Sequence, residues 1–555
     1  MVRATFSGFN TALSALQANQ KRLDITGQNL SNMNTAGYTR QQLEASSLNY
    51  TNPVSHYSNG NETAVGFGVS MDRVSQIRDP YLDIQYRSQS ADCSYTNRLQ
   101  TALNSLSKVL DETTISGIRQ AFDDVQSTLT SMQDPAKVSD PIYESELRTK
   151  MQSVCNLFNQ ASRQITQAEQ NEFQRLTGEG SSEQGDVQKI NDILRQIGDL
   201  NVQIKRNQVA GHPSLELQDE RNLLLDELSG YIPVETRYYK DDAHSGNNAY
   251  DYDANGAVIG KKDWPDDLEV SMNYIDAQGK SQKLILVNGS DLGAKGLTKN
   301  YGQLSVLNRD HKPAASVSDP ANISIRFEKA PSYQVNGQAA TDVYAELKGI
   351  HFEGGSLQAS LDMLQKKGTG NVINGSVDDV RGYQYYSEKL DQLADTFAKS
   401  MNASNNGNNH KDQNLLSNST DDSTNGITAG NIGISKGWTS GTIHISTDGT
   451  NRTDTILDMI AAMKDTKKLN GKTFADYMNN LSTQLASDSS SNQTALKTGT
   501  TVLNSIQDSR DSLSGVSLDE EATNMMAYVS AYNAASRLMT ALDEVLNTLI
   551  SNTGA

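Results

Sequence analysis

Apolar residues recur seven positions apart at both ends of the chain. The N-terminal repeat consists of Phe9, Leu16, Leu23 and Leu30, with Phe6 and Leu13 in its second position. The C-terminal repeat consists of Leu518, Met525, Tyr532, Met539 and Leu546, widened by Leu538, Leu542, Val545 and Leu549. Such spacing places side chains on one stripe of a helix, as in a coiled coil. The pattern therefore predicts a long amphipathic helix at each end.

Helix-breaking residues set the limits of these two helices. All prolines lie between Pro53 and Pro331, so neither end carries a residue that interrupts helix interiors. The N-terminal stripe ends in a segment of turn-forming residues that includes Asn29, Asn32, Thr35, Gly37 and Tyr38. Ser514-Gly515 reads as the break before the C-terminal helix, with Ser517 as its N-cap.

The pattern between the ends predicts helices on both sides of a β region. Helical spacing recurs at 147–168, 190–204 and 383–397, whereas short alternating runs fill 233–351. A polar stretch of loop and short strand is expected at 402–455. The predicted fold class is multidomain and mainly α, with an inserted all-β domain. The predicted domains are nested: 1–45 with 516–555 as a coiled-coil-like pair, 46–232 with 352–515 as a helical bundle, and 233–351 as the outermost β domain.

The terminal helices, taken as an isolated pair, should be only marginally stable. Their apolar faces are wider than one seam, and ordering the backbone of so many residues carries a large entropic cost. We therefore expect the ends to be mobile in the monomer and helical when neighbouring copies cover them. The alternative is an intramolecular coiled coil that binds nothing else. The sequence thus predicts a structural assembly subunit with its interface on the two repeats and the turn residues.

Charge argues against two classes of partner. The net charge is −18, with 66 acidic against 48 basic residues. Nucleic acids and anionic membrane surfaces are bound through Lys and Arg, so neither is expected as a partner. The start of the chain has no apolar signal-peptide region and no run approaches the roughly 18 apolar residues of a membrane helix. Cytoplasmic location, or export without a cleavable signal, are both compatible with this.

Candidate chemistry is weak throughout, so no catalytic residue, cofactor or metal is predicted. Gly471-Lys472-Thr473 lacks the earlier glycine of a phosphate loop, which favours a helix-capping turn. Residues 251–256 match the first half of a calcium loop, but Lys262 occupies the position of the bidentate Glu. A hairpin turn is favoured there, and weak calcium binding stays open. Tyr383, Tyr386 and Phe397 should be core, and Cys93 and Cys155 small buried residues.

Several motifs resemble those of bacterial flagellar axial proteins. They are Phe6-Ser7-Gly8-Phe9, Asn29-Leu30-Ser31-Asn32, Thr35-Ala36-Gly37-Tyr38-Thr39-Arg40, Ser514-Gly515-Val516-Ser517-Leu518 and Ala531-Tyr532-Asn533-Ala534. Internal segments such as Leu217-Gln218-Asp219-Glu220-Arg221 and Leu390-Asp391-Gln392-Leu393 are similar to the hook–filament junction branch of that family.

The resemblance implies a set of partners and a location. It implies self-association into a ring at the distal end of the hook, between the hook protein and the second junction protein. It also implies export by the flagellar type III apparatus and an export chaperone that holds the C-terminal helix. Two alternatives remain: another axial protein, namely the hook protein or the second junction protein, and a secreted adhesin that uses the β domain 233–351.

Overall fold

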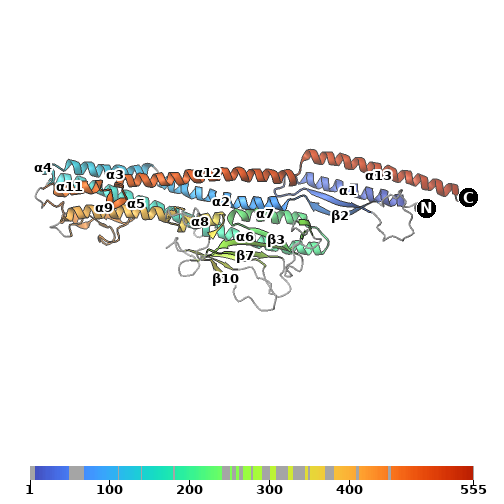
Figure 1. The fold of residues 1–555 in the computed structure, drawn as a ribbon, viewed down its shortest axis with the longest axis horizontal. Helices are drawn as coiled ribbons and strands as arrows, with labels where there is room; N and C mark the ends of the chain where they lie inside the picture. The colour runs from blue at the N-terminus through green and yellow to red at the C-terminus, as the bar shows by residue number, and fades with distance from the viewer. Residues whose placement is uncertain are drawn as a thin grey trace.

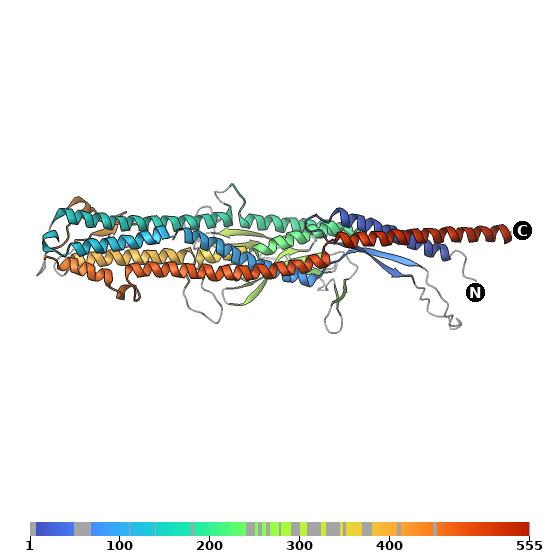
Figure 2. The same cartoon turned by 90° about the horizontal axis from the view of Figure 1, so that it is seen from above.

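The computed structural model shows an elongated, mainly helical molecule with α1 (Ser7–Ser31) and α13 (Leu518–Thr553) at one end (Figures 1 and 2). The structure describes residues 7–48, 68–109, 112–138, 140–178, 182–239, 250–252, 258–261, 267–276, 279–289, 300–307, 323–328, 344–347, 351–368, 380–407, 412–447 and 452–553. Among the described helices, none combines the length and the apolar character needed to cross a membrane.

The rest of the chain forms the body, which is built on long helices. They are α2 (Pro80–Val109), α3 (Glu112–Ser131), α4 (Pro135–Val138), α5 (Pro141–Thr177), α6 (Asp186–Val209), α7 (Leu215–Tyr231), α8 (Ser356–Gln365), α9 (Tyr383–Asn406), α10 (Lys436–Ser440), α11 (Asp454–Lys464), η3 (Lys467–Leu469) and α12 (Phe474–Ser514). Phe122 of α3, Phe397 of α9 and Phe474 of α12 contact one another in the core, with ring centroids 5.2–5.6 Å apart. The mainly helical prediction is confirmed.

Local signals explain where the body helices begin and end. The Asp140 side chain accepts a hydrogen bond from the backbone N–H of Ile142 and Pro141 opens α5, which ends at the left-handed Gly178. Thr473 caps α12 by accepting from the N–H of Asp476, so the helix-capping turn expected at Gly471-Lys472-Thr473 is confirmed.

The predicted apolar stripes and cysteines lie where the pattern placed them. Tyr383, Tyr386 and Phe397 are buried in the core, as predicted. Cys93 and Cys155 are free and buried, also as predicted.

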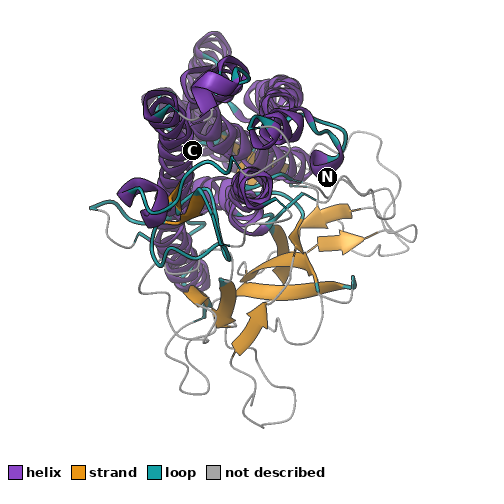
Figure 3. Ribbon diagram, turned by 90° about the vertical axis from the view of Figure 1, so that its left-hand side faces the viewer, coloured by secondary structure: helices purple, strands orange, loops and turns teal. Residues whose placement is uncertain are grey.

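The strands between α7 and α8 lie on one side of the helical layer (Figure 3). They are β3 (Glu235–Tyr239), β4 (Tyr250–Tyr252), β5 (Val258–Lys261), β6 (Asp267–Ile275), β7 (Ser281–Asn288), β8 (Gln303–Leu307), β9 (Ser324–Glu328), β10 (Tyr344–Leu347) and β11 (His351–Phe352). In one sheet, β6 pairs with β11, β3 and β7. A second sheet has the order β10-β9-β8. Most of the calcium-like loop, 253–257 and Lys262, lies outside the described residues.

Helix α6 fixes these sheets to the body through asparagine side chains. Asn191 donates to the carbonyl of Leu304 at 2.8 Å and accepts from its N–H at 2.7 Å, which satisfies both backbone groups of that residue in β8. Asn201 donates to the carbonyls of Leu268 and Gly289. The amides thus continue the hydrogen bonding of the sheets into the helical layer.

The hydrophobic pattern did not predict one strand pair. β1 (Gln41–Ser47) pairs antiparallel with β2 (Val69–Gln76), next to α1. Both strands are polar, so they carry little of the alternation by which strands are recognised. β12 (Leu416–Asn418) and β13 (Ile432–Ile434) also pair, within the stretch expected to hold short strands.

Candidate assembly interface

The terminal unit consists of α1, the β1–β2 hairpin and α13. Helix α13 lies along α1, where a Cβ at Gly8 would be 3.3 Å from a methyl carbon of Leu542. The guanidinium of Arg22 stands over the ring of Tyr528 at 5.6 Å. The hairpin contacts α1 through the N–H of Val69, which donates to the hydroxyl of Ser14 at 3.2 Å. Helix α1 therefore contacts both α13 and the hairpin.

Most residues of the two heptad repeats are partly buried in the terminal unit. Half-buried members are Phe9, Leu16, Leu23, Leu30, Met525, Met539, Leu542 and Leu546. More exposed members are Leu13, Leu518, Tyr532 and Leu549. Phe6 lies outside the described residues. The assignment of all these residues to an interface between copies stays a prediction.

The most deeply buried positions of α1 are, apart from one isoleucine, small or polar residues that the heptad did not single out. They are Ala12, Ala18, Asn19, Ile25, Thr26 and Asn29. Small side chains allow close approach of backbones, which suits a helix held between another helix and a hairpin. The signal available was a second seven-residue spacing, which relates Ala12 to Asn19 and Thr26, and Ala18 to Ile25. Among the side chains of α13 up to residue 551, only Glu521 and Ala535 are buried.

The turn after α1 is folded back by the side chain of Asn29. Its amide donates to the carbonyl of Gln41 at 3.0 Å and accepts from the N–H of the same residue at 3.0 Å. The hydroxyl of Tyr38 also donates to the Asn29 oxygen. Gly37 adopts a positive φ of 78°, which favours glycine. Asn32 is half-buried and Thr35 is exposed in the same turn.

Arg40 ties this turn to the start of α13. Its guanidinium contacts Glu520 at 2.7 Å and Glu521 at 2.8 Å, and Glu521 is buried. Its backbone N–H donates to the carbonyl of Ser514 at the break between α12 and α13. The acidic first turn of α13 therefore has a specific cationic partner in addition to the helix dipole.

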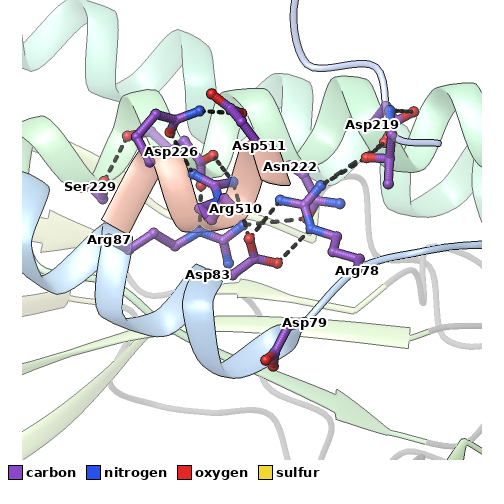
Figure 4. Close-up of polar contacts among 12 residues, drawn as sticks. Arg78, Asp79, Asp83, Arg87, Asp219, Asn222, Asp226, Ser229, Arg510 and Asp511 are labelled. Atoms are coloured by element: carbon purple, nitrogen blue, oxygen red, sulfur yellow. Dashed lines mark hydrogen bonds and ion pairs between the residues drawn. The ribbon is translucent and has the colours of Figure 1, made fainter. Parts of the chain in front are cut away.

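A cluster of six charged side chains, which we call the anchor cluster, lies at the end of the body next to the terminal unit (Figure 4). Its members are Arg78, Asp83, Arg87, Asp219, Asp226 and Arg510. One nitrogen of Arg510 contacts both Asp83 at 3.0 Å and Asp226 at 2.7 Å. Arg87 contacts Asp226 at 2.7 Å, and Arg78 donates twice to Asp83. The residues come from α2, the segment before it, α7 and α12.

The turn after α1 reaches this cluster through Thr39. Its N–H and hydroxyl donate to the two oxygens of Asp219 at 3.0 and 2.6 Å. Burial raises the pKa of Asp219 to about 6, although these hydrogen bonds and Arg78 act in the opposite direction. The carboxyl is therefore held in a site that disfavours its charge.

Helix α13 carries a second apolar stripe beside the face that contacts α1. This outer stripe consists of Ala527, Ala531, Ala534, Leu538, Ala541 and Val545, in alternating steps of four and three. All six are exposed, Val545 to 60%. A helix that packed only on α1 would be expected to carry polar residues there.

Comparison with known proteins identifies the family. Residues 103–416, more than half of the 555, match the family model described as the flagellar hook-associated protein FlgK helical domain. The chain belongs to the FlgK family of flagellar hook-associated proteins. Residues 9–39 match the flagella basal body rod protein model, and residues 509–552 match the C-terminal model of the basal body rod FlgEFG proteins.

Individual relatives of this FlgK-family chain agree. It is 29% identical to flagellar hook-associated protein 1 of Bacillus subtilis over 568 aligned residues, covering 99% of each chain. The corresponding proteins of Salmonella typhimurium and Escherichia coli are 29% and 28% identical over 41% of this chain and 38% and 39% of theirs. The solved FlgK structure from Burkholderia pseudomallei is 18% identical, with a TM-score of 0.36 over 60% of this chain and 44% of that one.

Membership in the FlgK family makes this chain a structural protein of the flagellar hook–filament junction. The match favours this assignment over the alternatives of hook protein and second junction protein. The two rod-type matches cover α1 with its turn, and the end of α12 with α13. Apart from the hairpin, the segments shared with other axial proteins therefore coincide with the terminal unit and its base.

Proposed function

We propose that this FlgK-family chain forms a ring at the distal end of the hook by self-association through its terminal unit. The outer stripe of α13 carries this proposal. Leu538 and Val545 would each gain about 1.5–3 kcal/mol on full burial. The four alanines between and before them let a second helix approach closely. An intramolecular pair that bound nothing else would gain nothing from apolar residues at these exposed positions.

The chain organisation fits a subunit that assembles through its ends. We infer nested domains, with residues 1–45 and 516–555 pairing as a coiled coil, the helical domain next and the β domain 233–351 outermost. The terminal unit would meet the hook protein on one side of the ring and the second junction protein on the other. Because α13 carries more of the exposed large apolar side chains than any other described helix, an export chaperone would cover it before type III export without signal cleavage.

We propose no catalytic role for the chain. Among the described residues there is no grouping of three or more metal-ligating side chains. A net charge of −18 keeps free subunits apart and disfavours nucleic acids and anionic membranes. We propose a structural role alone, without cofactor or metal.

The outer stripe can be tested by making it polar. The double variant Leu538→Ser with Val545→Ser should remain a folded monomer, because neither residue is buried in the single chain. It should lose self-association in sedimentation velocity and fail to restore filaments in a deletion strain that has intact hooks. Together the two substitutions should remove about 3–6 kcal/mol from each contact between copies. That loss would raise the dissociation constant more than a hundredfold.

Val502→Ser is the matched control for this experiment. Val502 is similarly exposed but lies on α12 in the body. It should self-associate as the wild type does. Normal assembly of the Leu538→Ser, Val545→Ser chain would refute the proposed interface.

A further inference from the structure

The anchor cluster joins segments that are far apart in the sequence. Arg78 and Asp83 precede or open α2, Asp219 and Asp226 lie on α7, and Arg510 lies one turn before the end of α12 (Figure 4). All six side chains of the cluster are largely buried, with at most 17% exposure. Three arginines balance three aspartates, so the site is neutral as a whole when all are ionised.

Both chain ends leave the body at this cluster. Thr39 is held by Asp219 just after α1, with the two hydrogen bonds at 3.0 and 2.6 Å. Arg510 is held by Asp83 and Asp226 just before α13. Between them, Arg40 bridges to the carbonyl of Ser514 and to Glu520 and Glu521. The C-terminal end of α1 and the N-terminal end of α13, which we call the bases of these helices, are thus fixed side by side. In the sequence they are separated by the whole body.

Polar contacts, rather than apolar burial, hold the bases of α1 and α13 to the body. Gln76 donates to the carbonyl of Leu215 at 2.9 Å, adding β2 to the same end of α7. The ring of Tyr86 lies under the guanidinium of Arg510 at 4.2 Å. Buried ion pairs add little net stability compared with apolar packing, but they permit only a few geometries. An arginine that bridges two carboxylates therefore sets direction and position rather than overall stability.

Fixing both bases matters because α1 and α13 have few buried contacts of their own. Two segments tethered near each other pair at an effective concentration in the millimolar range, whereas loosely tethered ones also pair with other copies. We propose that the anchor cluster and Arg40 are positioning residues that make the two ends of one chain pair with each other rather than with the ends of a neighbouring copy. This rests on the proposed function, in which the paired ends are the assembly interface.

A disulfide between α1 and α13 can report which ends pair. Gly8→Cys and Leu542→Cys are introduced together into the full chain, since these positions are in contact. Cys93 and Cys155 are buried and do not compete. After oxidation in dilute solution, non-reducing electrophoresis separates chains closed on themselves from chains linked in pairs. The parent should close almost entirely within one chain.

In this background Arg510→Met or Arg40→Met should raise the ratio of linked pairs to closed chains by about tenfold or more. Arg510→Lys keeps the charge and should restore much of the parental ratio. Arg195→Met, which removes an exposed ion pair on α6, should leave the ratio unchanged. Two variants are used because Arg510 contacts residues of the body, so its loss could disturb the body itself. The Arg40 side chain contacts Glu520 and Glu521 at the start of α13 instead.

The outcomes separate this inference from the proposed function. An unchanged ratio in both methionine variants would overturn the inference, as would a lower thermal midpoint of the body without a change in ratio. The Leu538→Ser, Val545→Ser chain should still close within itself while losing assembly. If that chain assembled normally, the proposed interface would fail while the role of the anchor cluster would still be decided by the electrophoretic ratio.

Discussion

At the scale of single residues, buried polar side chains make the joints of this molecule. Asn29 and Asn191 each satisfy both the N–H and the carbonyl of a distant residue, as a neighbouring strand would. Arg510 does the equivalent with charge by spanning two carboxylates. Unsatisfied buried polar groups are costly, so each joint permits one geometry and disfavours the alternatives.

Asp219 should make stability depend on pH in an unusual direction. Its pKa is raised from 3.8 to about 6, so the folded state binds a proton more readily than the unfolded state between these values. Its contribution is therefore fully present below pH 3.8 and is lost as pH rises through about 6. Relative to Asp219→Asn, the wild type should lose about 2 kcal/mol of unfolding free energy between pH 4 and pH 7, because part of the full contribution of about 3 kcal/mol is already lost at pH 4.

Urea unfolding of both proteins at several pH values measures this difference. Arg78, Thr39 and Glu216 face the carboxyl and are present in both proteins. Asp192→Asn, on an exposed part of α6, controls for the loss of a negative charge. A constant difference between Asp219→Asn and wild type across the range would show that the carboxyl titrates at its ordinary pKa.

At the scale of elements, α12 is one helix with two different environments. Its first turns bury Phe474, Tyr477, Met478, Leu481 and Leu485 in the core. From residue 486 to the end of α12 no side chain joins the apolar core, and the largely buried Arg510 belongs to the anchor cluster. This second half lies on α2 through polar contacts, such as Asn492 with Gln100 and with the carbonyl of Thr96. α12 is thus one continuous helix, but the apolar core stabilises its first half and polar contacts with α2 hold its second half.

The second half of α12 should therefore open independently of the first. Amide exchange should be more than about tenfold faster in residues 490–508 than in 474–485. Leu485→Ala should lower the unfolding free energy of the whole body by about 2–5 kcal/mol, because it leaves a cavity in the core.

Leu503→Ala is the comparison within the same helix. Leu503 is only half-buried, so its loss should cost about 1 kcal/mol or less and raise exchange only locally. Equal protection along the whole of α12 would contradict this division.

At the scale of the whole molecule, stability and assembly occupy opposite ends. The apolar core runs through the body, whereas α13 buries only Glu521 and Ala535 and exposes its outer stripe. Copies with a net charge of −18 repel one another until their short-range contacts form. In the proposed assembly, such an arrangement would reserve the apolar stripe of α13 for neighbouring copies.

The terminal helices should gain protection only on assembly. In the monomer, amides of α1 and α13 should exchange rapidly, and in the assembled ring their exchange should slow by about a hundredfold or more, while body amides change little. Hydrogen exchange with mass spectrometry compares the two states. Slow exchange of both helices in the monomer would contradict coupled folding and assembly.

Truncation provides the control for that comparison. A chain ending at Gly515 should keep most of the helical circular dichroism of the monomer if the ends are mobile there. A large loss of helical signal on truncation would show that α13 is already stable in the single chain.

Local periodicity was sufficient to predict several parts of this protein. The terminal repeats, the break at Ser514-Gly515 and the buried stripe of Tyr383, Tyr386 and Phe397 all follow from spacing and capping within a few turns of chain. The absence of proline after Pro331 left room for the 41 residues of α12. The family resemblance also rested on short motifs.

Only the tertiary structure revealed which distant residues meet. The pairing of β1 with β2, the burial of Ala12 and Ala18 between two partners, and the anchor cluster all involve residues that the apolar periodicity did not single out. Periodicity reports which face of a helix is apolar, but it does not report how many partners cover that face. Nor can it pair Arg510 with Asp83 and Asp226, because the contact depends on how α12, α2 and α7 pack together.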